Sequence, residues 1–94
     1  MAIFSNGAFK PYKTYNITAG TSPVSTPAFE HIGGVIRIAA MTDIYVAVGL
    51  NPVATKESMI IPKGKVEYLI AKENEKLSVL QVSQSGIVSV SEIQ

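Results

Sequence analysis

The sequence predicts an all-β fold, either a small antiparallel β-sandwich or a jelly-roll-like barrel with an extended N-terminal arm. Three observations support this prediction. Apolar and polar residues alternate with a period of two in successive segments, and no segment shows the 3.6-residue period of an amphipathic helix. The segments recur every ~8 to 12 residues with turn-forming residues between them, which is typical of sandwiches and barrels. A chain of 94 residues has room for one hydrophobic core.

The first part of the chain differs from the rest. A short strand is predicted at residues 13–18, and the Gly, Pro, Ser and Thr residues of 18–34 indicate a loop. We therefore divide the single domain into an N-terminal arm and loop segment, residues 1–34, and a β-sandwich core, residues 35–94.

Aromatic residues are concentrated near the N-terminus, where four of the seven occur: Phe4, Phe9, Tyr12 and Tyr15. Each aromatic side chain can bury ~150–250 Å², so these four are expected to pack against protein. They belong either to a first strand that closes the protein's own sandwich or to an arm that adds to the sheet edge of a neighbour. The sequence leaves both possibilities open.

The core segment contains five longer alternating stretches and a short one, at residues 35–41, 44–50, 66–71, 77–83, 87–93 and 59–61. In the second of these, the larger residues from Ile44 to Leu50 are expected to fill the core. Ala47 and Gly49 lie on its opposite face, and their small size would let another backbone approach closely.

Turn residues separate these stretches. Residues 62–65, 72–76 and 83–86 are each expected to connect hairpins, with Gly64 as a permissive position and Gly86 taking a positive φ. Asn51 precedes Pro52 and is therefore held extended. Together with Val53, these two residues predict a stiff, uncharged projection that suits a contact surface.

The low charge of the chain is its most informative bulk property. Charged residues make up 16% of the sequence, against about 25% in a typical soluble domain. Either Ser and Thr cover the surface, or other protein chains hide much of it, since charge is depleted at the centre of interfaces. The net charge of +1 implies neither nucleic acid nor membrane as the main partner. The N-terminus lacks the features of a secretory signal.

Catalytic and metal-binding motifs are not evident, and we expect no enzyme activity, cofactor or metal. His31, the single histidine, lies beside Glu30 in a predicted loop, and the chain has no cysteine nucleophile and no G-x-S-x-G elbow. The carboxylates form no D-x-D or E-x-x-H motif. Gly33 and Gly34 precede a strand, so they do not form a phosphate-binding loop.

Three segments resemble a pattern common in small proteins of tailed bacteriophages: AAMTDIYVAVGLNPVAT (39–55), IPKGKVEYL (61–69) and EKLSVLQVSQSGIVSVSEI (75–93). The most specific parts are G-x-N-P-x-A-T at 49–55 and G-x-x-x-V-x-E at 86–92. The resemblance implies a short β-sandwich component of the virion.

The resemblance leads to the hypothesis of a virion structural protein, assembled in the host cytoplasm, that decorates or cements the capsid. Its expected partners are the major capsid protein or other virion proteins and further copies of itself, as a trimer or other small oligomer. Contacts are assigned to two groups of residues: Phe4, Phe9, Tyr12 and Tyr15 on the arm, and Asn51, Pro52 and Val53 on the projection. The alternatives are a neck or tail adaptor and a carbohydrate- or receptor-binding module that uses Tyr45 and Tyr68.

Overall fold

The computed structural model describes residues 10–31 and 33–94, which form eight β-strands and no helix. The all-β prediction is confirmed. The strands are β1 (Pro11–Ala19), β2 (Val24–Ser25), β3 (Val35–Ala40), β4 (Ile44–Gly49), β5 (Met59–Ile61), β6 (Val66–Ile70), β7 (Lys76–Gln81) and β8 (Gly86–Ile93). Every longer stretch predicted from alternation is a strand, whereas the two-residue β2 was missed because it is too short to alternate.

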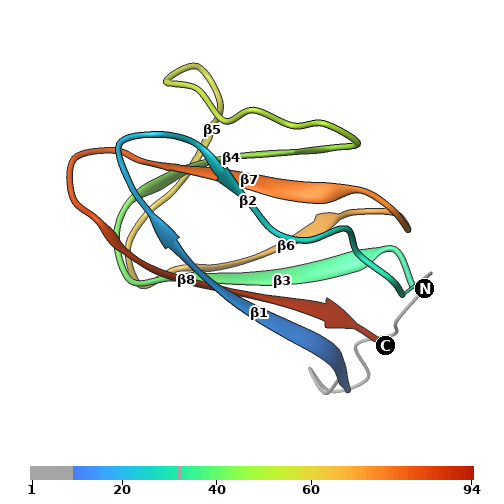
Figure 1. Cartoon of the computed structure of the whole chain (residues 1–94). Coiled ribbons are helices and arrows are strands. Elements are labelled where there is room, and N and C mark those ends of the chain that lie inside the picture. The colour runs from blue at the N-terminus through green and yellow to red at the C-terminus, as the bar shows by residue number, and fades with distance from the viewer. Residues whose placement is uncertain (1–9, 32) are drawn as a thin grey trace.

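The strands form two four-stranded sheets, in the orders β1-β8-β3-β6 and β2-β7-β4-β5, and all pairs are antiparallel. Figure 1 shows the two sheets packed face to face. Successive strands alternate between the sheets, with the single exception of the β4–β5 pair. Eight strands in this order form a jelly-roll sandwich.

The predicted hairpins at 62–65, 72–76 and 83–86 are wrong, because each of these segments crosses from one sheet to the other. Turn residues reverse the chain locally but do not decide which sheet receives the next strand. Gly64 has φ +81°, as a permissive turn residue should. Gly86 does not have a positive φ; a Cβ there would lie 2.7 Å from Thr42 Cγ2, so glycine provides space for that side chain.

The core lies between the sheets and is filled from both. Its buried strand residues include one face of four alternating stretches, those of β3, β4, β7 and β8: Ile36, Ile38, Ile44, Val46, Leu77, Val79, Val88 and Val90. Leu50 was expected among them but is 64% exposed, because β4 ends at Gly49 and the chain turns there.

Residues 10–34 are integrated into this sandwich. β1 pairs with β8 from Pro11 to Ala19, and Ala19 and Phe29 lie in the core. The sequence-based division placed residues 1–34 outside the β-sandwich core. In the structure β1 is part of the sandwich, because Tyr15, Ile17 and Ala19 point toward the core and β1 completes one sheet. Residues 1–9 lie outside the described part of the chain.

Candidate functional site

The outer face of the β1-β8-β3-β6 sheet carries almost no charge. Register pairs place Thr14, Ser91, Arg37 and Tyr68 in one row across the four strands, and paired residues share a face. Of the outward residues of these strands only Arg37 is charged: Thr14, Asn16, Thr18, Ile87, Ser89, Ser91, Ile93, Val35, Arg37, Ala39, Val66, Tyr68 and Ile70. Val35, Ser91 and Ile93 in this set are buried.

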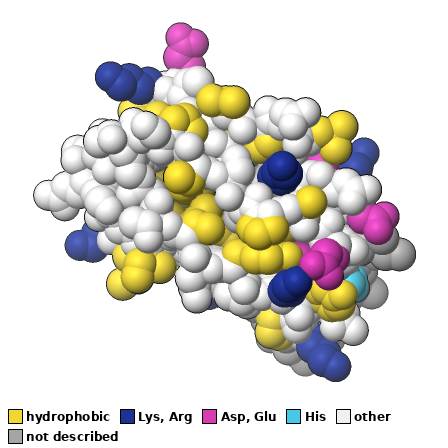
Figure 2. All heavy atoms as spheres, viewed as in Figure 1, with side chains coloured by type: hydrophobic (Ala, Val, Ile, Leu, Met, Phe, Trp, Pro, Cys, Tyr) yellow, Lys and Arg dark blue, Asp and Glu magenta, His cyan; other side chains and the backbone are white. Residues whose placement is uncertain are grey.

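This outer face has a polar half and an apolar half. Thr, Asn and Ser residues of β1 and β8 form the first, with a hydrogen bond of 2.8 Å between Thr14 Oγ1 and Ser91 Oγ. Val66, Tyr68 and Ile70 of β6 form the second and are 40%, 44% and 73% exposed. Figure 2 shows the low charge of the molecule on one side, where uncharged surface with apolar patches lies between scattered charged side chains.

The opposite outer face, on the β2-β7-β4-β5 sheet, is partly covered by the chain itself. The segment between β4 and β5 turns back along the sheet (Figure 1), and the Ala54 N–H donates to Ser78 Oγ over 2.9 Å at a buried position. Ser78 is the register partner of Ala47. As predicted, a backbone segment approaches the face of β4 that carries the small residue Ala47, but this segment belongs to the same chain. A Cβ at Gly49 would meet no neighbour, so that glycine is not required for the approach.

Residues 51–53 lie on this returning segment, and the structure leaves them accessible. Asn51 is exposed, Pro52 is half-buried and Val53 is 63% exposed. Thr55 and Ser58 fix the segment further on, since the Thr55 N–H donates to Ser58 Oγ over 2.9 Å. The G-x-N-P-x-A-T pattern therefore includes the buried anchor Ala54 next to an exposed tip.

Replacing Ser78 by Ala is expected to loosen this segment. The Ala54 N–H would remain buried without its acceptor, which costs about 1.5 kcal/mol of unfolding free energy. Chemical denaturation measures the loss, and amide exchange at Ala54 should accelerate. Ser58→Ala is the matched control, because it removes a similar bond at an exposed position and should cost well under half as much. Equal losses in both variants would contradict the assigned role of Ser78.

The N-terminal aromatic residues have different surroundings. Phe4 and Phe9 lie outside the described residues. Tyr12 is 46% exposed, and its ring centroid lies 4.9 Å from that of His31. Tyr15 packs against the core, with its ring centroid 6.1 Å from that of Phe29. For Tyr15 the structure matches the first of the two alternatives, a strand that closes the protein's own sandwich.

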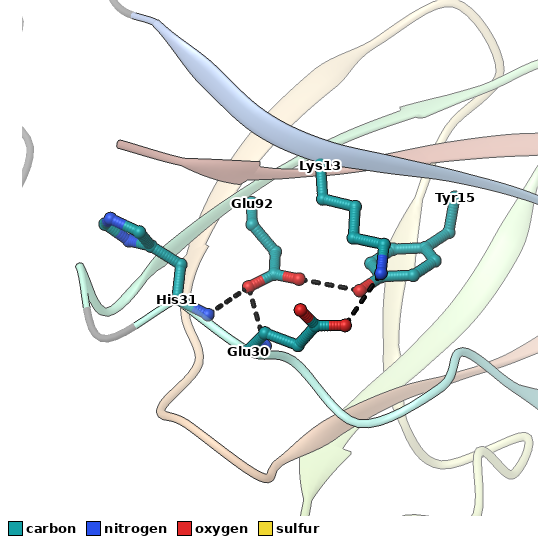
Figure 3. A network of polar contacts seen from close by, with 5 residues as sticks. All are labelled: Lys13, Tyr15, Glu30, His31 and Glu92. Carbon is teal, nitrogen blue, oxygen red and sulfur yellow. Dashed lines mark hydrogen bonds and ion pairs between the residues drawn. The ribbon is translucent and has the colours of Figure 1, made fainter.

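The buried carboxylate of Glu92 connects three segments at one end of the sandwich (Figure 3). Its Oε2 accepts a hydrogen bond of 2.7 Å from the Tyr15 hydroxyl of β1. Its Oε1 accepts bonds from the backbone N–H groups of Glu30 and His31, at 2.9 and 2.6 Å. Two consecutive N–H groups are thus directed at one carboxylate oxygen, and hydrogen bonds to the charged form stabilise it.

Two charged side chains complete the cluster. Lys13 Nζ lies 2.7 Å from Glu30 Oε2 and 5.7 Å from the centre of the Tyr15 ring. The hydrogen bond and the charge of Glu30 raise the pKa of Lys13. Burial, with the bond to Glu92, raises the pKa of the Tyr15 hydroxyl well above its ordinary 10.0. Tyr15 therefore stays a neutral donor to Glu92 at physiological pH.

The raised pKa of Tyr15 predicts a loss of stability at alkaline pH. The folded protein holds this proton more tightly than the unfolded chain, so the stabilisation is complete below pH ~10 and declines as the pH rises through the folded-state pKa. Tyr15→Phe should lower the melting temperature at pH 8, and its difference from the wild type should narrow above pH ~10. Thermal melts across this range measure both. Tyr12→Phe is the matched control, because it removes the hydroxyl of an exposed tyrosine, whereas Glu92 accepts its bond from Tyr15.

The sequence did not identify Glu92 as a binding partner, although a signal was present. The alternation that places Val88 and Val90 inward reaches Glu92 two residues later. A carboxylate at an inward position requires donors, and these come from residues 30 and 31, which are distant in sequence. Glu30 itself bonds Lys13, while His31 Nδ1 accepts from the Gly33 N–H over 2.7 Å, so Glu30 does not orient the imidazole.

The two tyrosines of the carbohydrate- or receptor-binding alternative lie in different sheets. Tyr45 pairs with Ile60 and Leu80 in one sheet, whereas Tyr68 belongs to the other. Asp43 Oδ1 accepts from the Lys63 N–H over 2.7 Å. The structure therefore does not combine the two tyrosines into one carbohydrate site.

The start of β1 and residues 51–53 lie at the same end of the sandwich. β1 begins there beside the end of β8, where the Gln94 N–H donates to the Lys10 C=O over 2.8 Å. β4 also ends there, since Gly49 pairs with Lys76, and a short link joins Lys76 to the end of β6. Figure 1 shows the chain leaving β4 on the side where β1 begins and the C-terminus lies.

Within residues 10–31 and 33–94 no pocket is found, and no group of three or more acidic or histidine side chains could hold a metal ion. None of the described residues forms a helix that could span a membrane. No protein-family model and no curated protein sequence matches this chain.

Proposed function

We propose that this chain is a structural protein of a tailed-phage virion that decorates or cements the capsid through protein–protein contacts. The observation that supports the proposal is the outer face of the β1-β8-β3-β6 sheet, on which Arg37 is the only outward charge among the described residues and Val66, Tyr68 and Ile70 are exposed. Depletion of charge marks the centre of protein interfaces. The sequence resemblance to small phage proteins selects the virion as the setting.

The contact segments act together with this face. Residue 10 and residues 51–53 lie at one end of the sandwich, so an N-terminal arm and the projecting tip can contact the same capsid surface. On a symmetric shell each weak contact is repeated, and a bound copy makes its next contact effectively intramolecular. Major capsid proteins and neighbouring copies are the proposed partners; nucleic acid, membrane and cofactors have no part in the proposal.

Removal of residues 1–9 tests the arm. β1 starts at Pro11, so this deletion leaves every described strand intact. The shortened protein should bind capsids that lack it at least about tenfold more weakly, because the aromatic contacts of Phe4 and Phe9 are lost. A full-length Phe4→Ser/Phe9→Ser variant should match the deletion. Unchanged affinity in a pull-down with empty capsids would contradict the arm hypothesis.

The position in the particle distinguishes decoration from a neck or tail adaptor. Quantitative mass spectrometry of purified virions should find one copy for every few major capsid subunits if the protein covers the shell. A single ring of copies would support the adaptor, and absence from virions would overturn both.

A further inference from the structure

The imidazole of His31 makes a contact that the proposed function does not use. The Gly33 N–H donates to its Nδ1 over 2.7 Å. A Cβ added at Gly33 would lie 2.6 Å from Nδ1 and Cε1 of this ring and 2.7 Å from the carbonyl oxygen of Ile93. Glycine therefore lets the backbone lie directly against the imidazole, next to the end of β8. His31 is only half-buried, so water can reach this residue.

The contact requires one form of the imidazole. Nδ1 accepts a hydrogen bond only when it carries no proton, so the ring is neutral and its proton is on Nε2. Uptake of a second proton makes both ring nitrogens donors, and the Nδ1–H group would then face the Gly33 N–H, donor against donor. Histidine is the side chain that ordinarily changes its charge between pH 5 and 8. His31 is the single histidine of the chain.

Charged and titratable groups surround His31 on three sides. From β1, the ring centroid of Tyr12 lies 4.9 Å from that of His31, and Lys13 pairs with Glu30 of the same segment as His31. From β8, Glu92 accepts the backbone N–H of His31 over 2.6 Å. Figure 3 shows the imidazole directed away from the carboxylates of Glu30 and Glu92. An imidazolium is attracted to carboxylates and to aromatic rings, so a protonated ring has favourable positions outside its present contact.

We propose that His31 is a pH-sensitive latch: its neutral imidazole holds the Gly33 backbone, and protonation of Nδ1 breaks this bond and releases the ring. The next residue, Gly34, accepts from the Ala71 N–H over 3.0 Å at the end of β6. Release therefore loosens the connection into β3 and the adjoining end of β6. This end of the sandwich also contains the start of β1. An effect of pH on capsid binding rests on the proposed function, whereas the latch itself does not.

NMR spectroscopy of the full-length purified chain tests the latch. At pH ~7.5, long-range proton–nitrogen correlation spectra should show the His31 ring with Nδ1 unprotonated. As the pH is lowered to ~5, the Gly33 amide resonance should shift with the same midpoint as the His31 Cε1–H resonance. The protection of the Gly33 amide against hydrogen exchange, corrected for the intrinsic effect of pH, should fall about fivefold, as expected for the loss of one hydrogen bond.

Two variants separate the latch from other effects of pH. His31→Asn places an amide oxygen at the δ1 position, which accepts from the N–H two residues on and does not titrate. Its Gly33 protection should be the same at both pH values. His31→Ala has no acceptor and should match the protonated wild type throughout.

Three results would overturn the latch: a wild-type Gly33 amide that does not respond to pH, a proton on Nδ1 at the higher pH, or an equal response in His31→Asn. If a variant fails to fold, the wild-type titration decides, since a common midpoint supports the latch and separate midpoints overturn it. All of these readouts use the isolated chain, so failure of the latch leaves the proposed function to its own tests.

Discussion

Glu92→Ala is expected to cause a large loss of stability, about 3 kcal/mol of unfolding free energy. Without the carboxylate, the Tyr15 hydroxyl and the N–H groups of Glu30 and His31 lose their shared acceptor. Each donor left without a partner in a buried environment costs free energy, and the link between β8, β1 and the 29–31 segment is broken. For a domain of this size, thermal unfolding should show a decrease in melting temperature of about 15 °C.

Two further variants test this interpretation of Glu92. Glu92→Gln keeps the shape and one acceptor oxygen, so it should lose less than half as much as the alanine variant. Glu67→Ala removes an exposed carboxylate from β6 and should change the unfolding free energy by less than about 0.5 kcal/mol. If Glu92→Ala were as stable as Glu67→Ala, the hydrogen bonds of Glu92 would contribute no net stability.

Gly86→Ala is expected to cost about 2 kcal/mol through overpacking. The added Cβ would lie 2.7 Å from Thr42 Cγ2 and 2.8 Å from Thr42 Cβ. Thr42 has little freedom to move away, because it is buried and its Oγ1 donates to the Gln84 C=O over 3.0 Å. Urea unfolding at equilibrium measures the loss.

A double variant identifies Thr42 as the cause. Thr42→Ser removes the closest atom, Cγ2, so the cost of Gly86→Ala should be partly relieved in the Thr42→Ser background. Gly20→Ala is the matched control, since a Cβ at that position meets no atom within 4 Å. Strictly additive losses in the double variant would show that the destabilisation has another origin.

Local sequence patterns were sufficient for the strands. Alternation located every strand longer than two residues. The same patterns could not give the topology. A turn such as 72–76 reverses the chain in the same way within one sheet or between two, and only packing of the whole core selects between them.

The candidate surfaces were predictable only in part. The low overall charge left two possibilities open, a surface covered by Ser and Thr or one hidden by other chains, and which uncharged residues share a sheet face depends on register between strands far apart in sequence. The Glu92 cluster was missed for a related reason. Its acceptor and its donors come from residues 15, 30, 31 and 92, and no local spacing joins them.

The common location of Lys10, Gln94 and the Asn51 tip gives the molecule a polarity along its long direction. The connections at the other end include Thr21 and Ser22, both exposed between β1 and β2. A foreign peptide inserted between these two residues would point away from Lys10 and the Asn51 tip. Under the proposed decoration of a capsid, this opposite end is the position for displaying an epitope.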